Sequence, residues 1–443
     1  MTPRRSVLGE SIATAALAGL LFGFDTAVIA GVTGDLTSRF ALSPEWLGIT
    51  VSAALWGTLV GALFAGKPGD RYGSRDSLRV LAFFYLLAGI GTALAGTWTM
   101  FVLFRFVCGL AIGGSSVLAP VYISEIAPPR RRGLLVGLFQ FNIVLGILVA
   151  YLSNAVVGLF DLGMVAWRWK LGVTALPALL FCLLLYRIPN SPRWLAIRGD
   201  EAAARDSLSR IGMDNAAATA EMAAIRADIA TAPRDERLSW SKHRRPILLA
   251  VALAAFNQLA GINAILYYLN DIFADAGSLS PDVQAVMIGT ANLIFTFVGM
   301  LLIDRIGRKT LLVAGAAGMT FCLAAAAAVL FHLLPRGLML PALIGFIAFF
   351  APSQGAVIWV YLSEIFPTSV RARGSGLGAS THWLLNALVA SAFPAISAWS
   401  PGAPFLFFAA MMAVQVIVVS LFFPETKGVR LEDMHARMLE PHR

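Results

Sequence analysis

The sequence has 443 residues, of which 58% are hydrophobic and 13% are charged, and its mean hydropathy is +0.76. Soluble domains are about 45–50% apolar and about 25% charged, so this composition excludes a soluble enzyme, a disordered protein and a coiled coil. The formal net charge of +9 would suit nucleic-acid binding, but the placement of the charges favours another explanation. We therefore predict an all-α, polytopic membrane protein.

A membrane-spanning helix needs about 20 mostly apolar residues. The sequence contains twelve such runs, at residues 11–32, 45–66, 77–96, 99–122, 134–156, 168–187, 246–270, 283–303, 310–331, 338–362, 375–396 and 403–423. Arg4 and Arg5 before the first run suggest a signal peptide. The run is a full span that carries Asp25, however, and eleven more follow, so we expect it to be retained.

Basic residues are distributed unevenly over the predicted loops. Of the 34 Lys and Arg residues, 29 lie at the N-terminus, in every second loop, in the central segment or in the C-terminal tail. These regions share one side of the membrane, so the positive-inside rule predicts that both termini are cytoplasmic. The basic charge then reflects topology and contact with anionic membrane lipid, and no nucleic-acid partner is expected.

Three loop motifs recur at nearly one offset. GDRYGSR at 69–75 returns as DRIGRK 234 residues later, YISEIAPPRRRG at 122–133 returns as YLSEIFPTSVRARG 239 residues later, and PNSPR at 189–193 returns as PETKG 235 residues later. This duplication predicts two parallel six-helix halves, which is typical of a rocking transporter. The expected parts are an N-terminal bundle, a cytoplasmic helical segment, a C-terminal bundle and a cytoplasmic tail, at residues 1–187, 188–245, 246–423 and 424–443.

Three ionisable side chains, Asp25, Arg105 and His382, lie deep inside predicted spans. Each costs about 2.5–3.5 kcal/mol at the membrane centre, so such groups indicate function. At about 1.5 Å per residue, Asp25 and Arg105 both lie about 6–7 Å to the outer side of the midplane and are predicted to pair. The pair is either a permanent salt bridge or a proton switch, because burial disfavours a charged carboxyl and a nearby Arg favours it.

The whole motif set resembles the sugar porter family of the major facilitator superfamily. The signatures D-R-x-G-R, S-E-x-x-P-x-x-x-R-G, P-x-S-P-R-W-L and P-E-T-K-G match, as do GLLFGFDTAVIAG at 19–31 and NQLAGINAILYY at 257–268. The resemblance covers almost the entire chain. It implies import of a monosaccharide by alternating access, with proton symport as the favoured mode and facilitative uniport as the alternative.

By this resemblance, Asp25 and Arg105 are the proton-coupling residues, since proton-coupled members carry aspartate at this place and facilitative members carry asparagine. One departure weakens that inference. The proton-coupled xylose porters have a further glutamate in the sixth span, where this chain has Thr174. If that second carboxylate is needed, coupling here is weaker or depends on Asp25 alone.

A sugar-binding site needs amides, which both donate and accept hydrogen bonds, and flat aromatic surfaces for the sugar ring. The family motifs place such amides at Gln140, Asn257, Gln258, Asn263 and Asn292. They place the aromatic side chains at Phe22, Trp359 and Trp383. Amides in membrane helices also hold helices together, which is the alternative for each of them.

Three departures from the family pattern affect the identity of the sugar. Asn257 stands in place of the usual glutamine, Ile147 replaces a second glutamine of the xylose porters, and His382 occupies a position held there by an amide. For His382 three roles stay open: a hydrogen bond to a neighbouring side chain, a sugar contact, or pH sensing.

Charged residues of the repeated loops are predicted to form a cytoplasmic gate. Opposite charges at these helix ends can pair and hold the halves together when the inside is shut, although solvated surface charge is the alternative. The predicted gate residues are Asp70, Arg71, Glu125 and Arg132 and their counterparts Asp304, Arg305, Glu364 and Arg371. Asn190 replaces the glutamate of the family's P-E-S-P-R motif, so one charge is missing.

Other classes of function fit less well. A sugar sensor that does not transport would carry a long cytoplasmic tail, and only 20 residues follow the last span. A membrane enzyme would need a reactive constellation at membrane depth, which the scattered Cys and His residues do not supply. We expect no catalytic residue, no cofactor and no metal, and a monomer in the cell membrane whose partners are the sugar, a proton and lipid.

Overall fold

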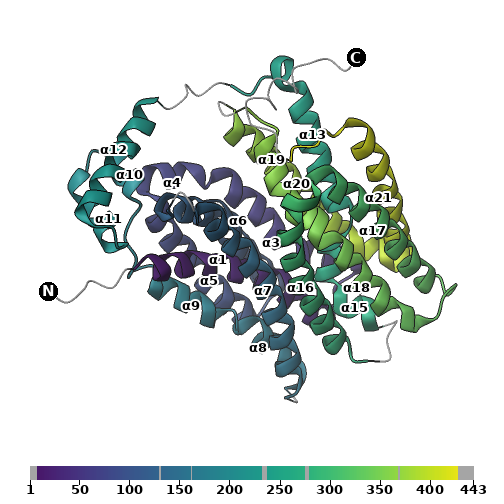
Figure 1. Cartoon of the computed structure of the whole chain (residues 1–443). Helices are drawn as coiled ribbons and strands as arrows, with labels where there is room; N and C mark the ends of the chain where they lie inside the picture. Colours follow the sequence, from purple (N-terminus) through teal and green to yellow (C-terminus); the bar gives the residue numbers. More distant parts are fainter. Residues whose placement is uncertain are drawn as a thin grey trace. The chain divides into compact units, whose positions relative to one another are not determined.

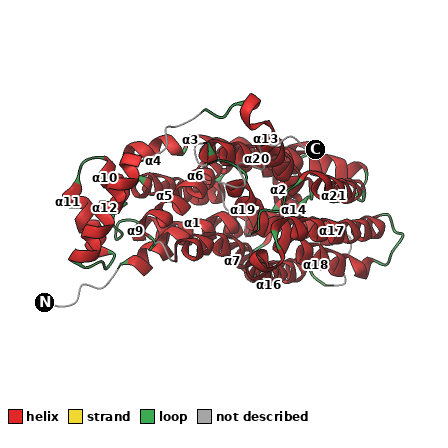
Figure 2. Ribbon diagram, turned by 45° about the horizontal axis from the view of Figure 1, so that its top comes forward, coloured by secondary structure: helices red, strands yellow, loops and turns green. Residues whose placement is uncertain are grey.

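The computed structural model describes residues 7–128, 131–160, 162–231, 237–274, 279–367 and 370–427. Over these ranges the secondary structure is helical, with no strand (Figure 2). Eleven helical stretches there are long and apolar enough to cross a membrane. The remaining predicted span, 375–396, lies within the long helix α20 (Arg371–Trp399), which begins with the small and polar residues RARGSGLGASTH. The prediction of an all-α membrane protein is confirmed.

The chain forms two compact units. Unit 1 comprises Met1–Asp25, Trp56–Ile147 and Arg168–Pro233, and unit 2 comprises Thr26–Leu55, Leu148–Trp167 and Arg234–Arg443. The division crosses helices α1, α3, α7 and α8 (Figure 1), so unit 2 includes one end of each of these four helices as well as the second half of the chain. The boundaries at 187, 245 and 423 stay sequence-based predictions.

Unit 1 is built around α1, α5 and α6, whose buried residues form one hydrophobic core with α9 and part of α7. Its helices are α1 (Leu8–Val28) as far as Asp25, the later part of α3 (Pro44–Phe64), α4 (Gly66–Tyr72), α5 (Ser74–Leu94), α6 (Trp98–Ile126), the first part of α7 (Arg132–Gly158), most of α8 (Ala166–Gly172), α9 (Ala175–Leu184), α10 (Pro192–Ile197), α11 (Glu201–Arg210) and α12 (Asn215–Thr231).

Helices α1 and α7 are in backbone contact because each has a glycine where the other approaches. A Cβ on Gly23 would lie 1.8 Å from the carbonyl oxygen of Ile143, and one on Gly146 would lie 2.2 Å from that of Leu20. Small residues permit such close helix packing in membranes. The contact fixes the part of α1 that carries Asp25.

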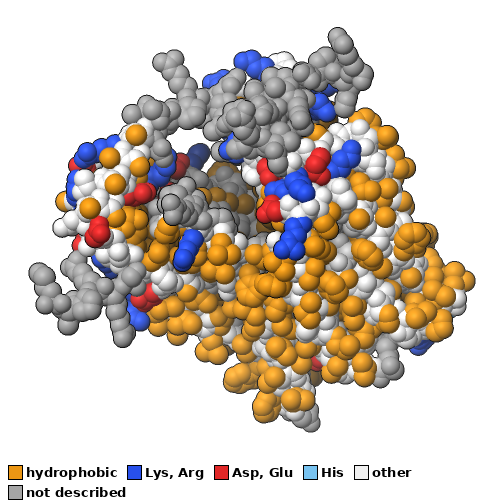
Figure 3. Space-filling model, in the orientation of Figure 1, with side chains coloured by type: hydrophobic (Ala, Val, Ile, Leu, Met, Phe, Trp, Pro, Cys, Tyr) orange, Lys and Arg blue, Asp and Glu red, His pale blue; other side chains and the backbone are white. Residues whose placement is uncertain are grey.

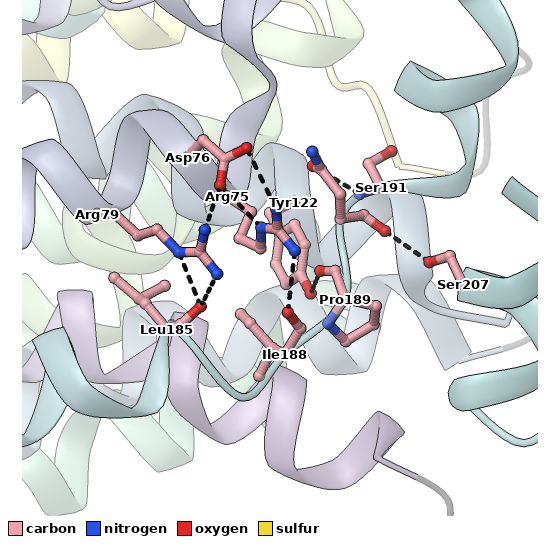
Figure 4. A network of polar contacts seen from close by, with 10 residues as sticks. Arg75, Asp76, Arg79, Tyr122, Leu185, Ile188, Pro189, Ser191 and Ser207 are labelled. Atoms are coloured by element: carbon pink, nitrogen blue, oxygen red, sulfur yellow. Dashed lines mark hydrogen bonds and ion pairs between the residues drawn. The ribbon is translucent and has the colours of Figure 1, made fainter. Parts of the chain in front are cut away.

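Side chains of three helices hold the segment that follows α9 (Figure 4). Asp76 bridges the two arginines of α5, at 3.0 and 2.8 Å. Four side chains donate hydrogen bonds to backbone carbonyls of this segment: Arg79 to Leu185, Arg75 to Ile188, Tyr122 to Pro189 and Ser207 to Asn190. Helices α10 to α12 follow, and α11 and α12 share a small apolar core. This network therefore anchors helices α10 to α12 to the bundle of unit 1.

Unit 2 combines the second half of the chain with ends of earlier helices. Tyr151 donates a hydrogen bond to the carbonyl of Leu266 at 2.9 Å, and Thr33 donates to Asp271 at 3.0 Å. Its helices are the end of α1, η1 (Ile29–Gly31), α2 (Thr33–Phe40), the first part of α3, the end of α7, η3 (Gly163–Val165), the start of α8, α13 (Trp240–Leu259), α14 (Ile262–Tyr267), α15 (Leu269–Ala274), α16 (Pro281–Ile306), α17 (Arg308–Leu330), η4 (Arg336–Leu338), α18 (Met339–Phe350), η5 (Ala351–Gly355), α19 (Ala356–Glu364), α20 and α21 (Ala403–Phe422).

The predicted seventh span is broken at Gly261, between α13 and α14. Gly261 has φ +81°, and a Cβ there would lie 2.2 Å from the Phe408 ring, so both conformation and space require glycine. The break separates Asn257 and Gln258 on α13 from Asn263 on α14. Broken helices of this kind commonly form substrate sites in transporters.

Hydrophobic side chains cover much of the surface seen in Figure 3, and charged side chains gather towards the top of that view. Many large apolar residues of the long helices are exposed, among them Leu103, Phe297 and Leu421. In water such surface would cause aggregation, whereas lipid accommodates it.

Candidate functional site: a buried ion pair and an amide cluster

Unit 1 contains an ion pair in its core. Arg105 Nη1 on α6 donates to Asp25 Oδ1 on α1, and the two residues are only 3% and 4% exposed. These are the two residues that depth along the spans predicts to pair. The Cys108 thiol donates to the same carboxylate oxygen at 3.3 Å. Asp25 therefore receives hydrogen bonds from a permanent cation and from a neutral donor one helical turn further along α6.

Unit 2 contains a cluster of four buried or half-buried polar side chains around the helix break. Gln258 Nε2 donates to Asn257 Oδ1 at 3.0 Å and contacts the His382 ring nitrogens at 3.1 Å. Asn263 Nδ2 donates to Gln258 Oε1 at 3.0 Å. Gln258 is thus at the centre of the cluster, with both its nitrogen and its oxygen engaged.

The geometry around Gln258 constrains His382. The side-chain nitrogen of Gln258 has two hydrogens, one directed to Asn257 and the other to the imidazole. The ring must present an unprotonated nitrogen to accept it, so His382 is neutral in this arrangement and its second nitrogen carries the proton. Both ring nitrogens lie 3.1 Å from Gln258 Nε2, so either of them can be the acceptor.

Aromatic rings flank the imidazole. The Trp359 and His382 ring centroids are 5.2 Å apart, and those of His382 and Trp383 are 5.0 Å apart with nearly perpendicular planes. Trp383 is buried, whereas Trp359 is 40% exposed. The cluster therefore combines donors, acceptors and an accessible aromatic face, which are the groups that bind a sugar ring.

The other predicted sugar contacts are Asn292, Gln140 and Phe22. Asn292 is buried on α16. Gln140 on α7 and Phe22 on α1 are half-buried in unit 1, where Phe22 packs against the hydrophobic core. Contact of these three residues with a sugar stays a prediction.

Among the predicted gate residues, Asp304 and Glu364 converge on an arginine that the sequence argument did not select. Arg308 contacts Asp304 at 3.0 Å and Glu364 at 2.9 Å. In unit 1, the backbone carbonyls of Asp70 and Arg71 accept hydrogen bonds from Trp194 and Arg198.

The remaining four gate residues also lie near helix ends. Glu125 and Arg305 end α6 and α16, whereas Arg132 and Arg371 begin α7 and α20. The side chain of Arg132 lies outside the described residues. The first half has Ser74 at the position that corresponds to Arg308, which is why motif matching alone did not point to this arginine.

Glu425, in the repeated P-E-T-K-G motif, caps helix α17. Its carboxylate accepts hydrogen bonds from the backbone N–H groups of Arg308 and Lys309 at 2.9 and 3.0 Å, and from those of Thr426 and Lys427. Burial opposes ionisation, but the four N–H donors outweigh it and hold the pKa of Glu425 below its ordinary value of 4.5. An anion at a helix N-terminus is also stabilised by the helix dipole.

Replacing Glu425 with glutamine should lower the melting temperature of the purified protein at pH 7. The depressed pKa means that its stabilising effect is complete above the ordinary pKa and is lost as the pH falls through the lowered value. The expected cost is about 0.3–1 kcal/mol, and the difference from wild type should shrink below about pH 4.5. Asp206→Asn, at an exposed carboxylate on α11, is the control; equal effects of both variants at pH 7 would contradict the capping role.

Three further polar residues of unit 2 were not predicted. Gln354 in η5 and Gln415 on α21 are fully buried and bonded to each other at 2.5 Å. Asn386 on α20 donates to the Tyr267 hydroxyl at 3.3 Å. A signal was present in the sequence, because Gln354 and Gln415 are the only amide side chains within their predicted spans. Within the described residues, no group of three or more His, Cys, Asp or Glu side chains could hold a metal ion.

Known proteins share this architecture. The chain is 33% identical to the D-xylose-proton symporter of Escherichia coli K12, over 95% of this chain and 94% of that protein. It is 34% identical to the glucose facilitated diffusion protein of Zymomonas mobilis, over 95% of both chains. The inward-open structure of the xylose transporter XylE from E. coli superimposes with a TM-score of 0.87 at 32% identity, over 97% of this chain and 99% of that one.

The family described as "Sugar (and other) transporter" matches residues 11–438, which is nearly the whole chain. The resemblance noted in the sequence motifs is thereby confirmed, and the relatives are transporters rather than enzymes. The chain belongs to the sugar transporter family of the major facilitator superfamily and is a multi-pass membrane transporter of sugar.

Proposed function

We propose that this transporter imports a monosaccharide, either a pentose or a hexose, together with a proton. The observation that carries the proposal is the buried ion pair of Asp25 and Arg105 in unit 1. Removing two charges from water has a penalty of several kcal/mol for each ion. Ion pairs at membrane depth often mark proton relays in transporters, which supports a coupling role.

In this proposal Asp25 is the proton carrier. Arg105 and the Cys108 thiol stabilise the charged carboxylate, and a proton bound to Asp25 removes that charge and weakens the ion pair. Proton binding at Asp25 would therefore act on the contact between α1 and α6.

The amide cluster of unit 2 is proposed as the main part of the sugar site. Asn257, Gln258 and Asn263 present donors and acceptors next to Trp359, the exposed aromatic ring. By the family motifs, the remaining sugar contacts are Phe22, Gln140, Asn292 and Trp383. The transported sugar is expected to displace the water that these groups would otherwise contact.

His382 is proposed to set the preference among sugars. Its neutral ring has one N–H donor and one acceptor nitrogen, whereas a glutamine side chain has two N–H donors and an acceptor oxygen. His382→Gln should therefore change the ratio of hexose to pentose affinity, by about 5-fold or more for a single hydrogen bond in a dry site. Competition of unlabelled D-glucose and D-xylose against uptake measures the ratio. A variant that folds poorly and keeps the wild-type ratio would assign His382 to packing.

Facilitative uniport is the second candidate, because one relative is a glucose facilitated diffusion protein and because Thr174 stands where xylose porters carry glutamate. In that case the ion pair of Asp25 and Arg105 would be a permanent bridge between α1 and α6. Uptake of labelled pentoses and hexoses into proteoliposomes, with and without an inward proton gradient, separates the two. Symport predicts accumulation above the outside concentration only with the gradient, and uniport predicts equilibration in both conditions.

The remaining parts of the proposal concern setting and gating. We propose a monomer in the plasma or bacterial inner membrane, surrounded by lipid, with both termini in the cytoplasm. The charged helix ends of the repeated loops form the cytoplasmic gate. The contacts of Arg308 with Asp304 and Glu364 support a charge cluster at this end of unit 2.

A further inference from the structure

Two buried glutamines, Gln354 in η5 and Gln415 on α21, are connected to the amide cluster through hydrogen bonds. Neither of them is a predicted sugar contact. Gln354 and Gln415 have no exposed surface, and Gln354 Nε2 donates to Gln415 Oε1 at 2.5 Å. Buried amides are costly in a membrane protein unless they hold helices together or serve the site. Their connections decide between these two roles.

The Gln354 backbone joins the pair to the amide cluster. Gln354 belongs to the π-helical turn η5, and its carbonyl oxygen accepts a hydrogen bond from Asn257 Nδ2 at 3.3 Å. A π turn displaces carbonyls from the regular α-helical pattern and often occurs at functional sites. The Asn257 oxygen in turn accepts from Gln258, which contacts His382.

Glycines on two neighbouring helices allow those helices to pack closely against the π turn. A Cβ on Gly299 of α16 would lie 2.6 Å from Pro352 Cα, and one on Gly315 of α17 would lie 2.0 Å from the Ser353 hydroxyl. The turn therefore packs directly against two helices. A change at Gln354 has little room to relax away from Asn257, so it should reach the amide cluster.

We propose that Gln415 and Gln354 are positioning residues for the sugar site. Gln415 orients Gln354, the Gln354 carbonyl orients Asn257, and Asn257 orients Gln258 towards the sugar. The inference rests on the proposed sugar site in unit 2 and extends it to two residues that do not touch the sugar. Sugar affinity should therefore depend on the hydrogen bond between Gln354 and Gln415, although neither side chain contacts the sugar.

The test uses full-length protein in proteoliposomes, with labelled D-xylose and D-glucose as probes. Gln415→Leu removes the acceptor at similar volume and should raise the transport KM by about 3- to 10-fold, with the maximal rate nearly unchanged. Gln415→Glu is nearly isosteric and keeps an oxygen facing Gln354, so it should restore most of the affinity. Gln284→Leu is the matched control, since Gln284 is buried in the same unit and bonds only to the Leu279 carbonyl in the described contacts.

A double-mutant cycle with Asn257→Ala separates positioning from helix packing. If Gln415 acts through Asn257, its substitution should have little further effect on KM in the Asn257→Ala protein. Full additivity, an unchanged KM, or a fall in melting temperature with no change in KM would overturn the inference. If Gln258→Ala and Asn257→Ala also leave KM unchanged, the proposed sugar site itself is wrong; if they raise KM and Gln415→Leu does not, only the positioning role fails.

Discussion

Replacing Asp25 with asparagine should abolish sugar accumulation driven by a proton gradient while leaving sugar binding and sugar-for-sugar exchange largely intact. Asparagine is nearly isosteric with aspartate and resembles its protonated, neutral form. Exchange does not require the empty carrier to return in its deprotonated state, so it should continue. The measurement compares gradient-driven uptake with exchange of labelled sugar in the same proteoliposomes.

Arg105→Ala should uncouple transport in the same way, because it removes the cation that contacts the Asp25 carboxylate. Breaking a buried pair also lowers stability, by up to about 3–5 kcal/mol, so the yield of folded protein must be measured for both variants. Glu10→Gln is the control, since it changes an exposed carboxylate to an amide on the same helix α1. Gradient-driven accumulation by the Asp25→Asn protein would move the proton site elsewhere, with His382 as the next candidate.

Truncation of the amides to alanine should weaken sugar binding strongly. Losing a hydrogen bond inside a dry site costs about 1–3 kcal/mol, or roughly 5- to 150-fold in affinity. The effect should be largest for Gln258, which is bonded to both Asn257 and Asn263 and contacts His382. Gln140→Ala and Asn263→Ala should each lower affinity within the same range.

Asn142→Ala is the matched control for Gln140, because Asn142 lies two residues further along α7 and donates to the carbonyl of Leu138 in its own helix. Equilibrium binding of labelled D-xylose and D-glucose to purified protein measures the affinities. Wild-type affinity in all three variants would assign these amides to helix packing and not to the sugar site.

The membrane-spanning helices could be predicted from the sequence, because the thickness of the membrane dictates their length. A hydrocarbon core of about 30 Å requires helices of nearly fixed length, so the long apolar runs could be located and residues placed at a depth along them. The pairing of Asp25 with Arg105 followed from depth alone, because an ionisable group far from water needs a partner at the same level.

The rotation of each helix could not be predicted in this way. In a soluble protein, polarity separates the buried face of a helix from the exposed face, but here lipid-facing and buried positions are both apolar. Cys108 and Val107 are equally apolar neighbours, and only the fold shows that Cys108 contacts Asp25. For the same reason the Gln354–Gln415 pair was missed, since no pattern along two separate spans shows that their amides meet.

Sugar-evoked proton movement tests whether Asp25 couples sugar transport to protons. Protein in liposomes with a trapped pH indicator is mixed with D-xylose or D-glucose in the absence of a gradient, wild type beside Asp25→Asn. The account predicts internal acidification on addition of a transported sugar for wild type, and none for the variant despite intact exchange. A wild-type protein that transports sugar without moving protons would be a facilitator, and the pair of Asp25 and Arg105 would then be a structural bridge.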